Sequence, residues 1–398
     1  MSTIAKLVPA QIKPSGFLAR FGLMAAALLL LAPAVLSDFR LSLLAKFLCF
    51  AIIALGIGLA WGQGGMLVLG QGMFFGMGGY CMGMHMKIVD AGPGNLPDIL
   101  TYSGKYVSLP WLWKPFSHAW FAVPMAMLLP MGIAALLGAA IFRQRIRGAY
   151  FAILNQALAG AFVIVIVGNL SLTGGTNGLT NFQSFFGLSV VDPNDQRILY
   201  FIVAIVLLVV FLLTRALVLA RYGRVFIASR DDEHRVRFLG YDPGRIKLVA
   251  YVLAAGMAGL AGALFVPVVG IISPALLGIV PSIEMVIWVA LGGRTVLAWA
   301  AAGAVIVNWA KTSISEQFPS GWLYLQGLLF VVVILFLPKG IAGLVENAKL
   351  FVARRRAGRP RAAIVAAAAT TAAVDADVRS EALATPKVPA SAKPKEVR

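Results

Sequence analysis

The sequence predicts an all-α fold: a polytopic transmembrane helical bundle of about ten spans, with broken or re-entrant helices and both termini in the cytoplasm. Three observations support this fold class. Hydrophobic residues make up 60% of the 398 residues and charged residues only 13%, whereas soluble domains carry roughly 25% charged residues. Apolar runs of about 18 or more residues recur, without the alternation of a membrane β-barrel. Lysine and arginine cluster in the segments between these runs.

The apolar runs set the positions of the spans. The first run follows Arg20 and is interpreted as an uncleaved helix instead of a signal peptide, because the next begins almost at once at Leu41. Residues 276–310 are short for two full crossings, so two shorter spans broken at Gly292 and Gly293, or a re-entrant half-helix, are expected. The other spans are expected near 41–60, 65–87, 118–142, 148–170, 198–220, 247–270 and 321–337.

The charge pattern divides the chain and orients it. A cytoplasmic lead at 1–20 precedes a transmembrane domain at 21–345, which contains a cytoplasmic loop at 221–246. The remaining residues, 346–398, form a basic tail with almost no aromatic residues, which is expected to be disordered. Because cytoplasmic loops carry the excess of lysine and arginine, both termini are placed in the cytoplasm. The outward loops hold only three cations, which are Lys105, Lys114 and Arg197.

Several classes of function are disfavoured by composition. The net charge of +18 does not indicate nucleic-acid binding, because the cations follow the loops of a membrane topology. Cys49 and Cys81 lie within apolar runs, as buried free cysteines commonly do. His85, His118 and His234 are too scattered for a metal site. With no nucleophile–base cluster and no G-x-x-x-x-G-K-[ST] motif, the chain is expected to be no enzyme and to hold no cofactor or metal itself.

Glycine is frequent inside two of the predicted spans, at 64–83 and 254–265. Small residues every three or four positions let helix backbones approach closely within a bilayer. The alternative for residues 64–79 is a broken helix that lines a cavity. The sequence leaves both interpretations open.

A polar interruption, "SRDDEHRVRFLGYDPGR" at 229–245, separates two uncharged apolar runs. Ser229 and Asp232 have the S-x-x-D spacing of a helix start, and the acidic residues between them and Glu233 suit the positive end of a helix dipole. Glu233 and Arg237 are i,i+4 partners. The pattern therefore predicts that a short helix begins here.

The same interruption has an apolar face and a clear end. Val236 and Leu239 share one face, with Phe238 beside them. Gly240 can take the left-handed position after a helix, and Pro243 prevents its continuation. The result is a capped helix of about ten residues on the cytoplasmic side. It is either a docking element or an ordinary basic loop resting at the interface.

The stretch "RDDEHRVRFLGYDPGRIKLVAYVLAAGMAGLAGALF" resembles the cytoplasmic loop and following helix of ABC-importer permeases of the branched-chain amino-acid type. The resemblance extends over residues 36–345 and includes "LVLGQGMFFGMGGYCMGM", "RGAYFAILNQAL", "LTGGTNGLTNF", "PSIEMVIWVALGGR" and "FLPKGIAGL". It implies that the Glu-to-Gly segment is a coupling helix that sits in a cleft of the ATPase subunit. The residues assigned to this coupling are Arg230, Asp232, Glu233, Arg237, Leu239 and Gly240.

Within that family, "NQAL", "TGGTNGLTNF" and "PSIEMVIWVALGGR" are most similar to the urea-uptake branch, specifically its second permease subunit. The chain departs from the family pattern at three places. His234 and Arg235 stand where small residues are usual, which puts the contacts with the ATPase cleft in doubt. Thr295 replaces a usual glycine at a turn, and Val68 replaces a common serine, which removes one hydroxyl from any pathway.

Polar residues inside the spans are the candidates for a translocation path, because such residues usually face a cavity. Each amide can instead bond between helices, Glu284 can cap its helix, and Trp288 can serve in packing. The turn at 173–179 forms either the outer mouth or a structural turn. The candidate path residues are Gln71, Asn155, Gln156, Thr173, Gly174, Gly175, Asn177, Glu284 and Trp288, with Asn308 as a further amide.

The expected substrate is urea or a short amide, because amides, hydroxyls and carbonyls suffice for a neutral molecule and the spans show no obvious cation for a substrate carboxylate. The alternatives are a branched-chain amino-acid permease of the same family and an ATP-independent channel or secondary transporter. The resemblance implies a bacterial inner-membrane subunit, surrounded by lipid, with a second permease as heterodimer partner. It also implies two ATP-binding cassette subunits that use ATP and Mg²⁺, and an extracytoplasmic substrate-binding protein.

Overall fold

The computed structural model describes residues 14–102, 106–146 and 148–317, together with scattered positions between 321 and 348. The chain divides into two units, Met1–Gly343 and Leu344–Arg398, and the features below belong to the first. Several predictions fall largely or wholly on other residues: most of the lead at 1–20, the last span at 321–337 and the basic tail at 346–398.

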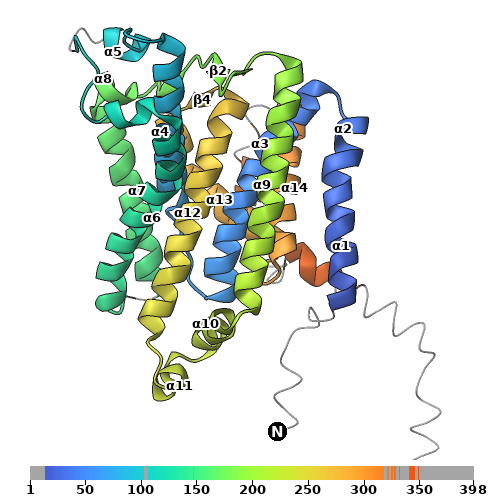
Figure 1. Cartoon of the computed structure of the whole chain (residues 1–398). Coiled ribbons are helices and arrows are strands. Elements are labelled where there is room, and N and C mark those ends of the chain that lie inside the picture. Colours follow the sequence, from blue (N-terminus) through green and yellow to red (C-terminus); the bar gives the residue numbers. More distant parts are fainter. Residues whose placement is uncertain are drawn as a thin grey trace, which may run out of the picture. The chain divides into compact units, whose positions relative to one another are not determined.

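The described part of the chain is mostly helical (Figure 1), as the sequence predicts, and its strands are two residues long. The long helices are α3 (Asp38–Ile57, continued by the π-helical η4, Gly58–Gln63), α4 (Gln71–Ala91), α6 (Ala119–Arg143), α7 (Ala149–Gly168), α9 (Pro193–Leu219), α12 (Pro243–Val269), α13 (Ile279–Gly292) and α14 (Leu297–Gln317). The short elements are α1 (Pro14–Ala26), η3 (Ala27–Leu31), α2 (Ala32–Val35), α5 (Asp98–Tyr102), η5 (Lys114–Ser117), α8 (Leu170–Thr173), β1 (Leu179–Thr180), β2 (Ser184–Phe185), β3 (Leu188–Ser189), α10 (Arg221–Asp231), α11 (Glu233–Phe238), β4 (Ile271–Ile272) and η6 (Pro274–Leu276).

Six helical segments of the described residues are long and apolar enough to cross a membrane. A shorter apolar segment, Phe21–Val35, precedes them. The chain is therefore a multi-pass membrane protein, while the count of about ten spans and the sides of the termini stay predictions. The six segments are Asp38–Gln63, Ala119–Arg143, Ala149–Gly168, Pro193–Leu219, Pro243–Val269 and Pro274–Gly292.

The centre of the bundle is formed by α3 and α12, of whose most apolar windows 83% and 72% of the residues are buried. Glycines bring α12 against its neighbours. A Cβ added to Gly78 of α4 would lie 1.9 Å from the carbonyl oxygen of Gly259, and one added to Gly262 would lie 1.9 Å from that of Phe75. Such distances leave no room for a side chain, so the glycines at 254–265 serve close helix packing.

The first glycine-rich stretch is a break in the helix and not one continuous span. The π-helical η4 ends at Gln63, residues 64–70 are non-helical, and α4 begins only at Gln71. The span predicted at 65–87 therefore starts too early. Gly65 has φ +70°, a conformation that favours glycine over residues with a side chain, and this is one reason why the helix stops here.

The second predicted break is also present. Gly293 has φ +123°, so the chain leaves the helical conformation there, and α14 starts at Leu297. The preceding α13 is only 14 residues long. The break at Gly292 and Gly293 is therefore confirmed, whereas only α13 is short, because α14 has 21 residues and extends to Gln317.

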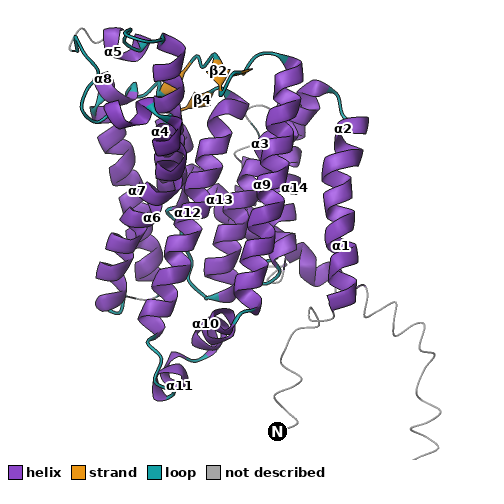
Figure 2. Cartoon of the chain, viewed as in Figure 1, coloured by secondary structure: helices purple, strands orange, loops and turns teal. Residues whose placement is uncertain are grey.

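The two ends of the bundle are built differently (Figure 2). One end carries α10 and α11, which extend past the ends of the long helices. The other end carries α5, α8 and all four strands. There β1 pairs antiparallel with β4, Leu179 opposite Ile272, and β2 pairs with β3, Ser184 opposite Ser189.

Candidate functional site

The helix α10 is fastened to the break that follows η4. Phe226 is fully buried, and its ring occupies the space where a Cβ on Gly64 would stand, 2.0 Å away. The Arg230 guanidinium donates from Nη1 to the carbonyl oxygen of Gly62 at 2.9 Å. Because Gly62 ends the central helix of the bundle, α10 is joined directly to its core.

A second bond joins α10 to α12. The Tyr222 hydroxyl donates to the carbonyl oxygen of Ile246 at 2.5 Å. Burial raises the pKa of Tyr222 to about 12, so the hydroxyl stays protonated and remains a donor at neutral pH. The loop is therefore fixed to two membrane helices.

The helix α11 begins at a different cap from the predicted one. Asp232, not Ser229, is the N-cap: its Oδ1 accepts from the backbone N–H groups of His234 at 3.0 Å and Arg235 at 3.2 Å. The backbone hydrogen bond from Arg235 is the largest of the interactions that hold the pKa of Asp232 below its usual value. Ser229 is buried inside α10, which continues to Asp231 and so leaves the capping position to Asp232.

The helix α11 is also shorter than expected. It spans the six residues Glu233–Phe238 instead of about ten. Gly240 takes φ +85°, the left-handed conformation predicted for it. Its N–H donates to the carbonyl oxygen of Arg237 at 2.9 Å, and that of Tyr241 donates to Val236 at 3.2 Å. These bonds close the end of the helix.

The predicted pair of Glu233 with Arg237 is wrong. Glu233 forms its ion pair with Lys247 in α12, and both side chains are largely buried, at 16% and 15% exposure. Arg237 instead lines a cavity beside that pair. Glu233 pairs with Lys247, 14 residues further along the chain, because α11 folds back onto the first turns of α12.

The apolar residues of α11 do not share one face. Val236 is buried at 2% exposure, whereas Phe238 and Leu239 are exposed at 93% and 74%. Two adjacent large apolar side chains are therefore exposed at the end of a capped helix. We call Phe238 and Leu239 the apolar tip.

Asn155 and Gln156 lie in the first half of α7, and their side chains point in different directions. Asn155 is 1% exposed; its Nδ2 donates to Phe151 and its Oδ1 accepts from the Tyr251 hydroxyl. The Nε2 of Gln156 donates across to the carbonyl oxygen of Ile279 at 3.0 Å. Both amides thus make the helix bonds that were the alternative to a path role.

Gln71 differs from these amides. It is 1% exposed, and neither its Oε1 nor its Nε2 has a hydrogen-bond partner among the described residues. The next residue, Gly72, donates its N–H to the Ser282 hydroxyl at 3.2 Å. Gln71 therefore begins α4 beside the first turns of α13, with its own amide unsatisfied.

Glu284 is an ion-pair residue and not a helix cap. Its two carboxylate oxygens accept from Lys311 Nζ of α14 at 3.0 and 2.9 Å, and α13 begins five residues earlier at Ile279. Lys46 of α3 interacts electrostatically with both partners. Two lysines thus lie beside Glu284, of which Lys311 is already paired with its carboxylate. Trp288 packs its ring 4.8 Å from that of Phe50, in agreement with a packing role.

The residues of the glycine-rich turn lie at the end of the molecule that carries the strands. Thr173 donates from Oγ1 to the carbonyl oxygens of Ile166 and Asn169, at 2.6 and 2.8 Å. Gly174 and Gly175 take positive φ values, at +80° and +57°. Asn177 is exposed and leads into β1. The turn thus supports the short sheet, as its structural alternative states.

This opposite end is held together by polar bonds that sequence reasoning missed. Lys87, at the end of α4, pairs with Asp98 at 2.9 Å and donates to the carbonyl oxygen of Asn181 at 3.2 Å. Asp90, one turn later, accepts from the backbone N–H groups of Gln183 at 2.8 Å and Ser184 at 3.0 Å. We call Lys87, Asp90 and their partners the polar clamp. It fixes two long loops to one helix.

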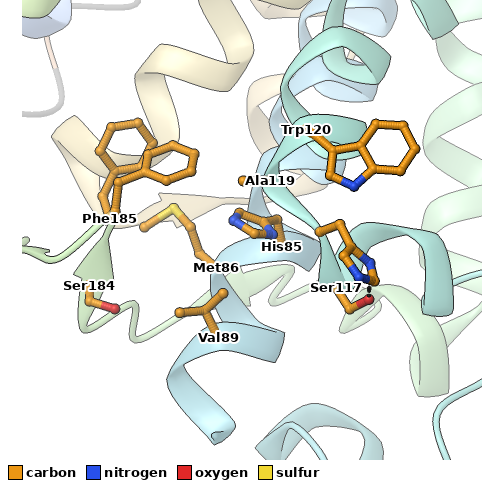
Figure 3. A pocket seen from close by; sticks show the side chains of 10 residues that line it. His85, Met86, Val89, Ser117, Ala119, Trp120, Ser184 and Phe185 are labelled. Carbon is orange, nitrogen blue, oxygen red and sulfur yellow. Dashed lines mark hydrogen bonds between the residues drawn. The ribbon is translucent and has the colours of Figure 1, made fainter. Parts of the chain in front are cut away.

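A cavity of about 550 Å³ lies beside the polar clamp (Figure 3). His85 and Met86 come from α4, Trp120 from α6, and Phe185 from β2. The Nδ1 of His85 lies 2.8 Å from the carbonyl oxygen of Phe116, so this nitrogen carries the proton. No short motif signals this cavity, because its residues are far apart in sequence.

The fold and these sites define a multi-pass membrane protein with an anchored, apolar-tipped loop at one end. Residues 39–337 match the family described as branched-chain amino acid transport system / permease component. Because this match covers more than half of the chain, the protein belongs to that family.

Individual relatives agree with the family. The chain is 28% identical over 342 residues to the high-affinity branched-chain amino acid transport system permease protein LivM of Escherichia coli (strain K12), covering 79% of this chain and 73% of the relative. It is 28% identical over 316 residues to LivM of Salmonella typhimurium, covering 73% and 67%. The autoinducer 2 import system permease protein LsrC of Escherichia coli O9:H4 is 32% identical over 123 residues, covering 29% and 36%. No solved structure matches the chain.

Proposed function

We propose that this chain is a permease subunit of an ABC importer in a bacterial inner membrane. It works with two separate ATPase subunits, which use ATP and Mg²⁺, with a second permease subunit and with an extracytoplasmic substrate-binding protein. The observation that carries the proposal is the apolar tip, 93% exposed at Phe238 and 74% at Leu239, on a helix that is capped at both ends. A surface of this kind is stable only when it is small or covered by a partner.

The coupling runs from the apolar tip into the bundle through three contacts. Glu233 connects α11 to α12 through Lys247, and Tyr222 connects α10 to α12. Arg230 connects α10 to the end of η4. When the ATPase subunits close, their displacement of α11 pulls on α12 and on η4, which continues α3. Asp232 and Gly240 keep α11 rigid enough to transmit this movement.

The proposed substrates are branched-chain amino acids. The two LivM relatives carry that substrate in their names, and none of the relatives named above is a urea permease. The structure also removes one argument for urea, since Lys311 and Lys46 lie in α14 and α3 beside Glu284. Cations in the spans are compatible with a substrate that carries a carboxylate.

The proposed path passes the start of α4 and α13. Gln71 supports this placement, because a buried amide without a partner costs roughly 1–3 kcal/mol and gains a partner when water or substrate enters. Gln156 lies at the adjoining start of α13 through Ile279. Thr173, Gly174, Gly175 and Trp288 act in support of the fold instead of in the path.

The test is uptake by cells that express the complete transporter, with labelled leucine and labelled urea offered separately. The proposal predicts ATP-dependent leucine uptake and copurification of the ATPase subunits with this chain. Urea uptake without leucine uptake would assign the other substrate within the same family. Uptake that continues without the ATPase subunits would instead favour a channel or secondary transporter.

A further inference from the structure

A second cavity, of about 300 Å³, lies between α11 and the membrane helices. The turn between α6 and α7 forms one wall, and the non-helical segment that starts at Gly65 forms another. The first turns of α12 and the inner side of α11 complete it. The cavity therefore stands where the docking loop meets the end of the bundle.

The charges of this cavity do not balance. Its charged lining residues are Arg145, Glu233, Arg237 and Lys247. Glu233 neutralises Lys247 in a largely buried ion pair. Arg145 and Arg237 have no ion-pair partner among the described residues, so two positive charges remain. A guanidinium group presents several donors in a plane, which matches the oxygens of a phosphate better than those of a neutral ligand.

The cavity also has an apolar side. Met66, Leu67, Phe142 and Phe151 line it together with the cations. A free phosphate ion gains nothing from such a wall, whereas a phospholipid places its glycerol and the start of its acyl chains there. Tyr150 at the adjoining start of α7 is 79% exposed, as is common for aromatic residues at a membrane–water interface.

The start of α7 faces the same space. Gly148 and Ala149 line the cavity, and Gly148, the N-cap, provides no side-chain hydrogen bond to the first N–H groups of this 20-residue helix. Those groups add a positive end of a helix dipole to the two guanidinium groups. Cavity, surplus charge and apolar wall thus indicate one ligand class.

We propose that this cavity binds the phosphate headgroup of an anionic phospholipid from the cytoplasmic leaflet. Arg145 and Arg237 contact the phosphate oxygens, and the apolar wall contacts the glycerol and upper acyl chains. The lipid then bridges the α6–α7 turn and α11, so the anionic lipid content of the membrane sets how firmly the docking loop is held. The proposal rests on the cytoplasmic placement of α11, but not on the substrate or on ATP.

The test measures retained lipid on the complete transporter in nanodiscs that contain equal amounts of phosphatidylglycerol and phosphatidylcholine. Native mass spectrometry is expected to find phosphatidylglycerol retained on the wild-type complex in preference to phosphatidylcholine. The double variant Arg145→Gln with Arg237→Gln is expected to lose about 25-fold in this preference, since each cation near the headgroups contributes about a factor of five.

The matched control is Arg143→Gln with Arg235→Gln, which removes two exposed cations, one at the end of α6 and one within α11, that do not line the cavity. Its preference should equal that of the wild type. Equal retention of both lipids by the wild type would overturn the proposal, and this readout does not depend on whether a variant folds. Retention of phosphatidylglycerol by the cavity double variant, or stabilisation of the wild type by inorganic phosphate as large as that by phosphatidylglycerol, would also overturn it. A cross-link from position 145 to a carboxylate of an ATPase subunit would overturn it as well, because the cation would then bind the ATPase instead of a lipid.

Because lipid retention is measured without substrate and without ATP, its failure leaves the proposed import function untouched. Conversely, a transporter that retains the lipid at Arg145 but imports nothing would contradict the proposed function alone. The two proposals therefore fail separately.

Discussion

The two ends of the bundle differ in how their polar groups are bonded and in which elements carry their exposed apolar groups. At the end with the strands, Lys87 and Asp90 form hydrogen bonds with backbone groups of a loop about 90 residues away in sequence. The polar groups of the polar clamp therefore bond to one another. At the end with α10 and α11, the anchoring bonds point inward, yet Phe238 and Leu239 are left exposed. Val107 at the strand end is exposed too, so the difference is that the α11 end presents its exposed apolar residues on a capped helix that is anchored to the bundle.

The largest expected effect comes from charging the apolar tip. In a variant with Phe238→Asp and Leu239→Asp, two side chains that make no core contact become acidic. Folding and membrane insertion should therefore persist, while uptake and copurification of the ATPase subunits should be lost. Affinity purification from cells that express all subunits measures this. Val107→Asp, a change at a 96% exposed apolar residue of the opposite end, is the control and should retain the ATPase subunits.

Breaking the polar clamp should reduce stability instead of ATPase binding. Asp98→Asn leaves the Lys87 ammonium, which is 5% exposed, without its carboxylate partner. Because Asp98 is itself 47% exposed, the loss should stay below the roughly 3 kcal/mol that removing one partner of a fully buried pair costs. Lys87→Met should cost less, because Asp98 is 47% exposed and keeps its contact with water. Thermal unfolding in detergent tests this order, and an equal loss in both variants would contradict it.

A smaller effect is expected at the end of α11. Gly240 has φ +85°, and nothing lies within 4 Å of a Cβ added there. Gly240→Ala should therefore cost only backbone strain, about 1–2 kcal/mol, and lower the uptake rate while leaving the bundle intact. Gly240→Asn should lower it less, because asparagine tolerates the left-handed conformation better. Initial uptake rates at equal expression measure both variants.

The smallest effect concerns the N-cap of α11. The pKa of Asp232 is lowered in the folded state, so its stabilising contribution is full above the unfolded pKa of about 3.9 and is lost as pH falls through the lower, folded value. Ser229→Ala should change nothing in the anchoring of α11, whereas Asp232→Ala should loosen it. Hydrogen exchange of the His234 and Arg235 amides distinguishes the two variants. Faster exchange of these two amides in Ser229→Ala would show that Ser229, and not Asp232, is the N-cap.

Local patterns predicted the local features of this molecule. The apolar runs located the long helices, Gly293 marked the break before α14, and Gly240 marked the end of α11. The helix break at 64–70 was an open alternative, because a run of glycines is compatible with both close packing and a non-helical segment. The structure shows both in turn: residues 64–70 are non-helical, with Gly65 at φ +70°, and Gly78 in α4 packs against Gly259.

The pairings that depend on the folded chain were out of reach of sequence reasoning. Glu233 has a suitable partner at the helical spacing of four residues, yet it pairs with Lys247 because α11 folds against α12. From the sequence, Glu284 could cap its helix, but in the structure the turn between α13 and α14 places Lys311 beside it, and the two form an ion pair. Ion pairs in a bundle are selected by proximity in three dimensions, and the spacing of residues along one helix does not contain that information.

The most direct measurement of the central claim is cross-linking from the apolar tip in a transporter that is active. Cys49 and Cys81 are buried, so Leu239→Cys provides the reactive thiol at this end. A short bifunctional maleimide should join position 239 to an ATPase subunit carrying a single cysteine in its docking cleft. The account predicts a cross-linked product whose formation stops uptake. An active complex in which position 239 reacts only with water-soluble thiols, and never with the ATPase subunit, would contradict it.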